Sequence, residues 1–191
     1  NKLKIFYLHY IMESKSNKKK KEVGVFSKSL LTRKIYINFE KLGNNIYTML
    51  ENKIKHQLEG KCTIEGYIQN DSISLISYSS GVLKDYSVQF EVVFECLICC
   101  PVEGMNIKCV VKNITQAGIK AIIGNEEETP VIIYLARDHH YNNSYFSSLK
   151  EKEEIQVKVV GQRYELNDKC ISVIGELSEK QVKKKTKLVI K

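Results

Sequence analysis

The sequence predicts an α+β protein in two parts: one helix among strands, then a small β-barrel. Three observations lead to this class. A single stretch carries apolar residues at helical spacing, alternating apolar residues fill most of the remaining chain, and five strand-like segments follow Pro101. The chain has 191 residues, of which 43% are hydrophobic and 27% are charged. These values suit one domain of average size or two small ones with a buried core.

The first part is predicted to run strand, helix, strand. Residues 34–39 alternate as a strand, and residues 62–68 predict another. Between them, five apolar side chains follow helical spacing: Ile46, Met49, Leu50, Ile54 and Leu58. Asn44 or Asn45 suits the start of this helix, and Gly60 suits its end.

A long strand over residues 88–100 contains three cysteines close together. Its side chains alternate between a strongly apolar face and a mixed one. Cys96 and Cys99 therefore point to opposite faces, while Cys96 and Cys100 share a face about 13 Å apart at roughly 3.3 Å per residue. Zinc requires thiolates about 2.3 Å from one centre. We therefore expect packed cysteines and no metal site. The six cysteines of the chain have no regular spacing, which indicates a reducing compartment and no disulfide scaffold.

The second part reads as a barrel. Pro101 ends the long strand because it has no N–H for a ladder, and residues 103–104 turn the chain. Five strands are then predicted, with a longer polar insertion between the third and the fourth: residues 106–114, 119–123, 131–135, 155–160 and 170–174. Five short strands of this kind suit an OB-type five-stranded barrel, a fold that binds oligonucleotides.

The basic charge is concentrated at the two ends of the chain. Residues 1–22 and residues 178–191 each carry a net charge of +5, so the total of +8 leaves −2 for residues 23–177. We interpret the ends as a basic N-terminal extension and a basic C-terminal tail, with phosphate attraction left open because lysine clusters release counterions. No apolar run approaches the roughly 18 residues of a membrane span, so we expect no membrane partner.

Three passages, residues 30–68, 88–124 and 153–177, occur in an order that resembles a known family. The first holds strand, helix and the LEGKC junction, the second crosses into the barrel, and the third closes it. Together they resemble the large stalk subunit of DNA-directed RNA polymerases, which includes the seventh subunit of RNA polymerase II and its archaeal counterpart. The resemblance covers roughly residues 26–177.

Two passages depart from the cellular members of that family. Cys99 and Cys100 replace the usual basic or aromatic residues, and residues 133–143 end the third barrel strand in an unusual way. Both look more like copies carried by large cytoplasmic DNA viruses. A composition rich in Asn, Lys, Ile and Tyr also fits an AT-rich genome.

The resemblance implies a truncated RNP-like tip domain over residues 23–101 and an OB-fold RNA-binding domain over residues 102–177. It implies a non-catalytic subunit that docks on the polymerase core near the clamp, contacts nascent RNA and packs against a small stalk partner. A tip loop at about residues 77–84 would enter the core, and its docking residues would be Ser79, Ser80, Gly81, Val82 and Leu83. A viral copy would reside in the virion and host cytoplasm, a cellular eukaryotic one in the nucleus.

RNA binding by an OB barrel requires cations and aromatic platforms. The candidates are Lys112, Lys120, Tyr134, Arg137, His139, His140 and Arg163. A free-standing OB-fold factor for single-stranded RNA is the alternative reading. An enzyme would need a motif such as HExxH, a Gly-rich phosphate loop or GxSxG, and none occurs. We therefore expect no catalytic residue and no cofactor.

Overall fold

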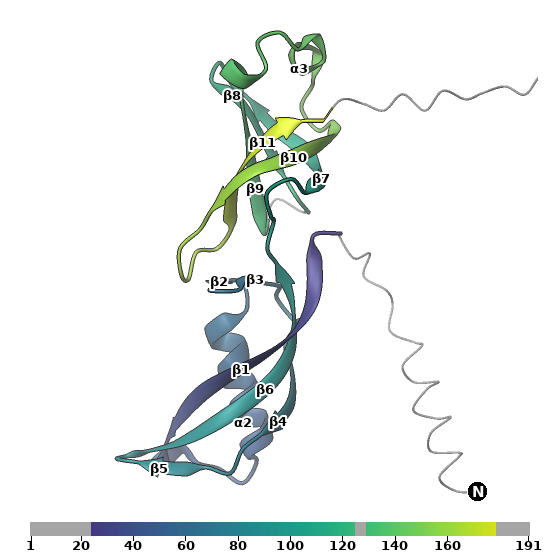
Figure 1. Cartoon of the computed structure of the whole chain (residues 1–191). Helices are drawn as coiled ribbons and strands as arrows, with labels where there is room; N and C mark the ends of the chain where they lie inside the picture. The colour runs from purple at the N-terminus through teal and green to yellow at the C-terminus, as the bar shows by residue number, and fades with distance from the viewer. Residues whose placement is uncertain (1–23, 125–128, 179–191) are drawn as a thin grey trace, which may run out of the picture.

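The computed structural model describes residues 24–124 and 129–178. In the view of Figure 1, a twisted sheet with one long helix lies below a small closed barrel. The lysine runs predicted as tails lie outside the described residues. No helix within the described ranges has the length and apolar character needed to cross a membrane.

The lower part, which we call the tip, is built around one long strand. Strand β6 (Ser87–Cys99) pairs antiparallel with β1 (Phe26–Asn38) along its whole length, from Cys99 opposite Phe26 to Ser87 opposite Asn38. Four shorter strands complete the six-stranded sheet on the other side of β6: β2 (Cys62–Thr63), β3 (Gly66–Ile68), β4 (Ser74–Tyr78) and β5 (Val82–Lys84). Strand β1 begins earlier than predicted. The prediction began at residue 34 because polar residues interrupt the apolar alternation of the strand before that point.

Helix α2 (Ile46–Leu58) has the predicted bounds. The side chain of Asn45 accepts a hydrogen bond from the backbone N–H of Thr48 at 3.3 Å, which satisfies one of the open donors of the first turn. Leu50 and Ile54 are fully buried in one cluster with the inward side chains of β6. The predicted apolar stripe is therefore the face that covers the sheet.

The alternation predicted for β6 is confirmed. Every even-numbered side chain from Val88 to Ile98 is buried in the cluster that α2 covers. Cys96 belongs to this tip cluster, whereas Cys99 belongs to the cluster inside the barrel. The two thiols therefore face different cores, as the strand geometry requires.

The segment predicted as one strand over residues 62–68 is instead a tight hairpin of β2 and β3. At its turn Gly66 has φ = +130°, a conformation that side-chain-bearing residues rarely adopt. The alternating pattern concealed this turn, because the turn residue Ile64 is apolar although it is 79% exposed. The hairpin pairs with the end of β6 through Tyr67 and Ile68.

The upper part is a closed five-stranded barrel with the neighbour order β10-β11-β9-β8-β7, and β7 pairs with β10 to close it. The strands lie within a few residues of the predicted ones: β7 (Asn106–Ile114), β8 (Gly118–Ile122), β9 (Val131–Ala136), β10 (Glu154–Arg163) and β11 (Ile171–Leu177). A short helix, α3 (Ser144–Ser148), lies in the insertion after β9. The closed barrel is consistent with an OB-like fold, while the RNP-like description of the tip stays a prediction.

The two parts share a core at their junction. The barrel's apolar cluster includes Val25, Cys62, Tyr67 and Cys99, all of which precede the first barrel strand in the sequence. The tip therefore supplies buried side chains to the barrel. We call these four side chains the closing wall of the barrel.

Candidate functional site

One row of the barrel's outer surface combines a cation, an aromatic ring and an aliphatic side chain. Lys120 on β8 lies opposite Tyr134 on β9, and Tyr134 lies opposite Ile174 on β11. Residues opposite each other on paired strands point to the same side of a sheet. Tyr134 is 43% exposed and Ile174 is 57% exposed, while their sequence neighbours Ile133 and Val173 are fully buried.

The next row extends the same surface toward β10. Arg163 lies opposite Ser172 on β11, which in turn lies opposite Ile132 on β9. We call Lys120, Tyr134, Arg163 and Ile174 the barrel face. Nη2 of Arg163 lies 3.6 Å from Oε1 of Glu165. Both side chains are largely exposed, so this ion pair constrains the guanidinium little.

The barrel face combines the side-chain types that contact single-stranded nucleic acids in OB folds. A tyrosine ring offers a stacking platform, and lysine and arginine attract phosphates. The face also includes the second and third barrel strands, on which OB folds bind oligonucleotides. Sequence reasoning missed Ile174, although its alternation with Val173 could have placed it outside.

Arg137 has a different setting, at the top of the barrel. Its Nε donates to the backbone oxygen of Gln116 at 2.8 Å, and its Nη2 donates to that of Thr115 at 2.9 Å. The guanidinium also lies over the ring of Phe146, 5.8 Å from its centre. Arg137 therefore fastens the turn after β9 to the loop between β7 and β8.

His140 is buried, with only 4% of its surface exposed. The backbone N–H of Leu177 donates to its Nε2 at 2.9 Å, so Nδ1 carries the proton and donates to the oxygen of Ala136 at 2.7 Å. The ring stacks on Phe146 with 4.7 Å between centres. Both nitrogens are used within the protein, whereas the neighbouring His139 is exposed.

Lys112 lies at an irregular point of β7, where the register with β8 shifts between Val111 and Asn113. It is exposed, but the strand register does not align it with Lys120. Of the predicted RNA-binding residues, the structure thus brings Lys120, Tyr134 and Arg163 together.

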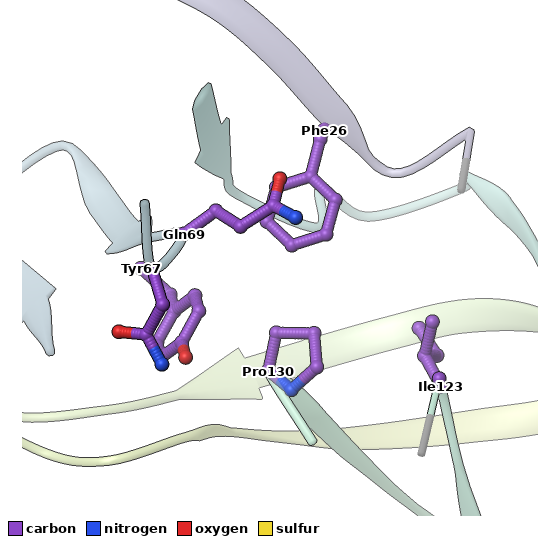
Figure 2. Close-up of a pocket in the computed structure, with 7 residues that line it drawn as sticks. Phe26, Tyr67, Gln69, Ile123 and Pro130 are labelled. Atoms are coloured by element: carbon purple, nitrogen blue, oxygen red, sulfur yellow. The ribbon is translucent and has the colours of Figure 1, made fainter. Parts of the chain in front are cut away.

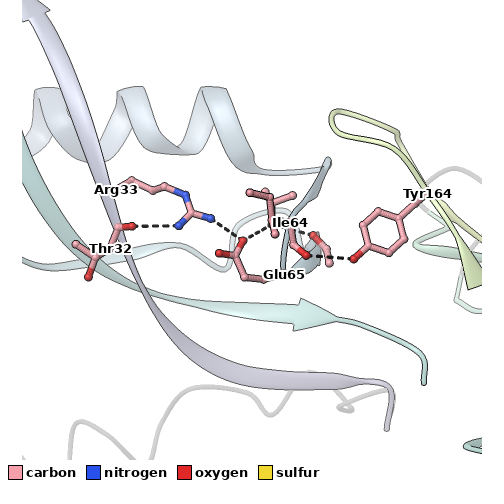
Figure 3. Close-up of polar contacts among 7 residues, drawn as sticks. Thr32, Arg33, Ile64, Glu65 and Tyr164 are labelled. Atoms are coloured by element: carbon pink, nitrogen blue, oxygen red, sulfur yellow. Dashed lines mark hydrogen bonds and ion pairs between the residues drawn. The ribbon is translucent and has the colours of Figure 1, made fainter. Parts of the chain in front are cut away.

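The loop between β10 and β11 is docked on the β2–β3 hairpin. The backbone N–H of Cys62 donates to the oxygen of Asp168 at 2.8 Å, and the N–H of Asn167 donates to the oxygen of Cys62 at 2.9 Å. The hydroxyl of Tyr164 donates to the oxygen of Ile64 at 3.3 Å (Figure 3). OB folds often use this loop for ligands, but here it fastens the barrel to the tip.

The same hairpin is held from the other side by β1. Nη2 of Arg33 lies 2.5 Å from Oε2 of Glu65 (Figure 3). The hydroxyl of Thr63 donates to the same oxygen at 3.0 Å. The hydrogen bond from Arg33 lowers the pKa of Glu65 below its usual 4.5, and the bond from Thr63 acts in the same direction. The hairpin turn is therefore fixed between the tip sheet and the barrel.

This geometry predicts an acid-sensitive junction. Because the pKa of Glu65 is lowered in the folded protein, its ion pair stabilises the fold above the ordinary value of 4.5, and this contribution is lost as the pH falls below that value. Glu65→Gln should therefore reduce stability at pH 7 and show a smaller further loss on acidification than the wild type. Urea unfolding at pH 7 and pH 4 measures the free energy of unfolding of both proteins. If the variant and the wild type lose the same free energy of unfolding between the two pH values, the role of Glu65 is contradicted.

The segment predicted as a tip loop is mostly strand. Only residues 79–81 separate β4 from β5, and Ser79 continues the pairing: its N–H donates to the oxygen of Glu91 at 2.8 Å, and its Oγ accepts from the N–H of Glu91 at 3.0 Å. The chain reverses later, at residues 85–86. A loop was predicted over about residues 77–84, and serines and glycine are common in loops.

An apolar surface nevertheless lies at this far end of the tip. Leu83 is 70% exposed, Val82 55% and Tyr86 92%. The N–H of Phe39, whose side chain is 63% exposed, donates to the oxygen of Tyr86 at 3.1 Å, which brings the two residues together. We call Phe39, Val82, Leu83 and Tyr86 the distal apolar surface; Phe39 and Tyr86 were not predicted.

Gly81, next to this surface, packs closely against the core of the tip. A Cβ at this position would lie 2.5 Å from Cγ1 of Val88 and 3.0 Å from Cε1 of Phe90, two buried side chains of the tip cluster. A bulky residue at Gly81 would disturb that cluster, so its effect on docking would be mixed with an effect on folding. Leu83 is the sharper position for a docking test.

Four of the six cysteines are buried, and Cys100 and Cys170 are half-buried. Burial raises the pKa of Cys96 to about 11 and that of Cys62, Cys99 and Cys109 to about 12. These thiols stay protonated at neutral pH and are poor metal ligands. Within residues 24–124 and 129–178, no three His, Cys, Asp or Glu side chains are grouped so that they could hold a metal ion.

The fold therefore defines a class of two-part protein. An OB-like barrel lies on one side of a shared junction, and the tip with its distal apolar surface lies on the other. The chain is 26% identical over 154 residues to a protein of Acanthamoeba polyphaga mimivirus whose name is "Putative DNA-directed RNA polymerase subunit L376". The similarity covers 71% of this chain and 73% of the mimivirus protein. No family model matches the chain.

Proposed function

We propose that the chain is a non-catalytic stalk subunit of a multisubunit DNA-directed RNA polymerase. The similarity to the mimivirus polymerase subunit supports a general role in RNA polymerase and association with other polymerase subunits. The observation that carries the stalk role is the separation of two unlike surfaces: the distal apolar surface lies at one end of the molecule, and the barrel face lies on the other part. Such a shape suits a subunit that docks at one end and projects the other outward.

The distal apolar surface is the docking end of this proposal. Leu83 and Tyr86 expose most of their side chains on a hairpin that extends beyond the tip cluster. Large exposed side chains of this kind become the energetic centre of an interface when a partner buries them. The partner is the polymerase core near the base of the clamp, and a small stalk subunit packs beside the tip.

The barrel face is the RNA end. Tyr134 offers its ring to an unpaired base, and each stacked base contributes about 1–3 kcal/mol. Lys120 and Arg163 flank it and attract phosphates of the emerging transcript. If the chain is viral, this assembly resides in the virion and in the host cytoplasm.

Leu83→Asp tests the docking end. A tagged full chain is expressed in cells that contain the polymerase it serves, and the recovered large polymerase subunits are measured. We expect recovery to fall at least about tenfold, because a central interface residue contributes about 2 kcal/mol or more. The charge should not affect folding, because Leu83 is 70% exposed.

Leu166→Asp is the matched control, since Leu166 is 63% exposed in the β10–β11 loop, away from the distal apolar surface. It should leave recovery unchanged. If Leu83→Asp is recovered with polymerase as well as the control, the docking site is wrong. If the wild-type chain recovers no large polymerase subunit at all, the stalk role fails, and a free-standing RNA-binding factor becomes the better account.

A further inference from the structure

A small pocket opens between the tip and the barrel. It has a volume of about 110 Å³. Phe26, Tyr67 and Gln69 line it from the tip, and Ile123 and Pro130 line it from the barrel (Figure 2). In Figure 2 the ring of Phe26 faces Pro130 and Ile123 across an open space. Ligand pockets occur preferentially at such domain junctions.

Gln69 supplies one polar side chain of the pocket, beside those of Tyr67 and Asn70. Its backbone is fixed, because its N–H donates to the oxygen of Leu97 at 3.0 Å and its oxygen accepts from the hydroxyl of Ser72 at 2.6 Å. Its carboxamide has no hydrogen-bond partner among the described residues and extends toward Phe26 (Figure 2). One donor group and one acceptor are therefore held at the rim and open to a ligand.

The described lining residues carry no formal charge. The pocket is therefore unsuited to a phosphate or a carboxylate and suited to an uncharged planar group. Aromatic side chains stack on unpaired RNA bases, and a carboxamide can pair with the donor and acceptor atoms of a base edge. Phe26 and Gln69 supply these two contacts.

The pocket also continues the barrel face. Pro130 directly precedes β9, and Tyr134 lies about 13 Å further along that strand at roughly 3.3 Å per residue. Lys120 lies opposite Tyr134, and Ile123 follows the end of β8. If an extended RNA strand stacks one base on Tyr134 and follows β9, another base further along the strand therefore lies at the opening of the pocket.

We infer that this pocket receives one unpaired base of a single-stranded RNA bound to the barrel face. The inference rests on the proposed RNA contact and adds a second position to it. It assigns Phe26 as the stacking residue and Gln69 as the residue that pairs with the base edge. An apolar side chain of a partner protein would fill the space as well, but it would leave the carboxamide of Gln69 unused.

The absence of tryptophan from the chain makes the test direct. Phe26→Trp in the full chain places a single tryptophan in the pocket, and its fluorescence should be quenched as a single-stranded oligonucleotide of RNA is added. In the otherwise unchanged chain, Gln69→Ala should weaken RNA binding severalfold. Phe26→Leu keeps the apolar contact but loses the stacking face, and it should weaken binding about tenfold.

Gln156→Ala is the control, since Gln156 is an exposed glutamine on β10 away from the pocket. Thermal unfolding of each variant separates a loss of binding from a loss of folding. Uridine 5′-monophosphate should quench the introduced tryptophan only at far higher concentration than the oligonucleotide, because no described lining residue holds its phosphate. Equal binding of the mononucleotide would overturn the inference in favour of a small-molecule site.

The remaining outcomes separate this inference from the proposed function. If Tyr134→Ala weakens RNA binding but Gln69→Ala matches Gln156→Ala and the introduced tryptophan is not quenched, the pocket is not a base site and the RNA role stands. If the fluorescence of the Phe26→Trp variant responds to polymerase subunits and not to RNA, a protein side chain is the occupant and the inference is wrong. If the full chain binds no RNA, both the inference and the RNA role fail.

Discussion

Replacing Phe94 with alanine should lower the free energy of unfolding by about 3–5 kcal/mol, a large part of the roughly 5–15 kcal/mol that stabilises a typical domain. Phe94 is the largest fully buried side chain in the protein's described core, and it lies in the tip cluster beside Val92 and Cys96. Its truncation removes apolar contacts and leaves a cavity that the surrounding sheet cannot fill. Urea unfolding followed by circular dichroism measures the loss.

Phe39→Ala is the matched control, because the same side chain is removed where it is 63% exposed. Its effect on stability should stay within about 0.5 kcal/mol. The same variant should weaken association with the polymerase core, since Phe39 belongs to the distal apolar surface. Equal stability losses for the two variants would show that the core of the tip is not packed as described.

Replacing Gly66 with alanine should cost about 2–6 kcal/mol, because it combines backbone strain with a clash. Gly66 has φ = +130°, and a Cβ there would lie 2.5 Å from the backbone oxygen of Cys99. The β2–β3 hairpin must then move away from β6, and it carries with it the hydrogen bonds between Cys62 and the β10–β11 loop. Trypsin should consequently cut this loop at Lys169 faster than in the wild type.

Gly104→Ala separates the effect of backbone strain from the effect of the steric clash. Gly104 also has a positive φ of +82°, but no atom lies within 4 Å of a Cβ built there. Only the backbone strain remains, at about 1–2 kcal/mol, and the rate of cleavage at Lys169 should not change. If the two alanine variants lose equal stability and are cut equally fast, the close approach of Gly66 to Cys99 does not hold the junction.

Local periodicity was sufficient to predict the elements that bury one regular face. The bounds of α2 followed from five apolar positions and a capping asparagine, and the two faces of β6 followed from strict alternation. The five barrel strands were found for the same reason. In each case the chemistry of near neighbours in the sequence determines the structure.

Features that depend on distant contacts were not predictable in this way. The hairpin turn before Gly66 contains Ile64, an apolar side chain that is 79% exposed, so the apolar alternation continues through the turn. The segment around Ser79 has a loop-like composition, yet pairing with Glu91 on β6 keeps it extended. Tyr164 contacts Ile64 across 100 positions of sequence, which no local pattern reveals.

The candidate site shows the same limit. Lys120, Tyr134 and Arg163 were selected by residue type, but only the strand register places them on one surface. His140 was selected on the same basis and is instead buried against Phe146, because the insertion after β9 folds back over it. Phe26 and Gln69 were not singled out, since the pocket exists only where the tip meets the barrel.

The closing wall of the barrel gives the order of synthesis a physical meaning. Val25, Cys62, Tyr67 and Cys99 are translated before any barrel strand, and N-terminal parts of a chain generally fold first on the ribosome. The nascent barrel strands therefore meet an apolar surface that is already assembled. In a permuted gene that encoded the barrel ahead of the tip, the barrel would remain open at its lower end until translation was complete, and its interior would be exposed to aggregation throughout.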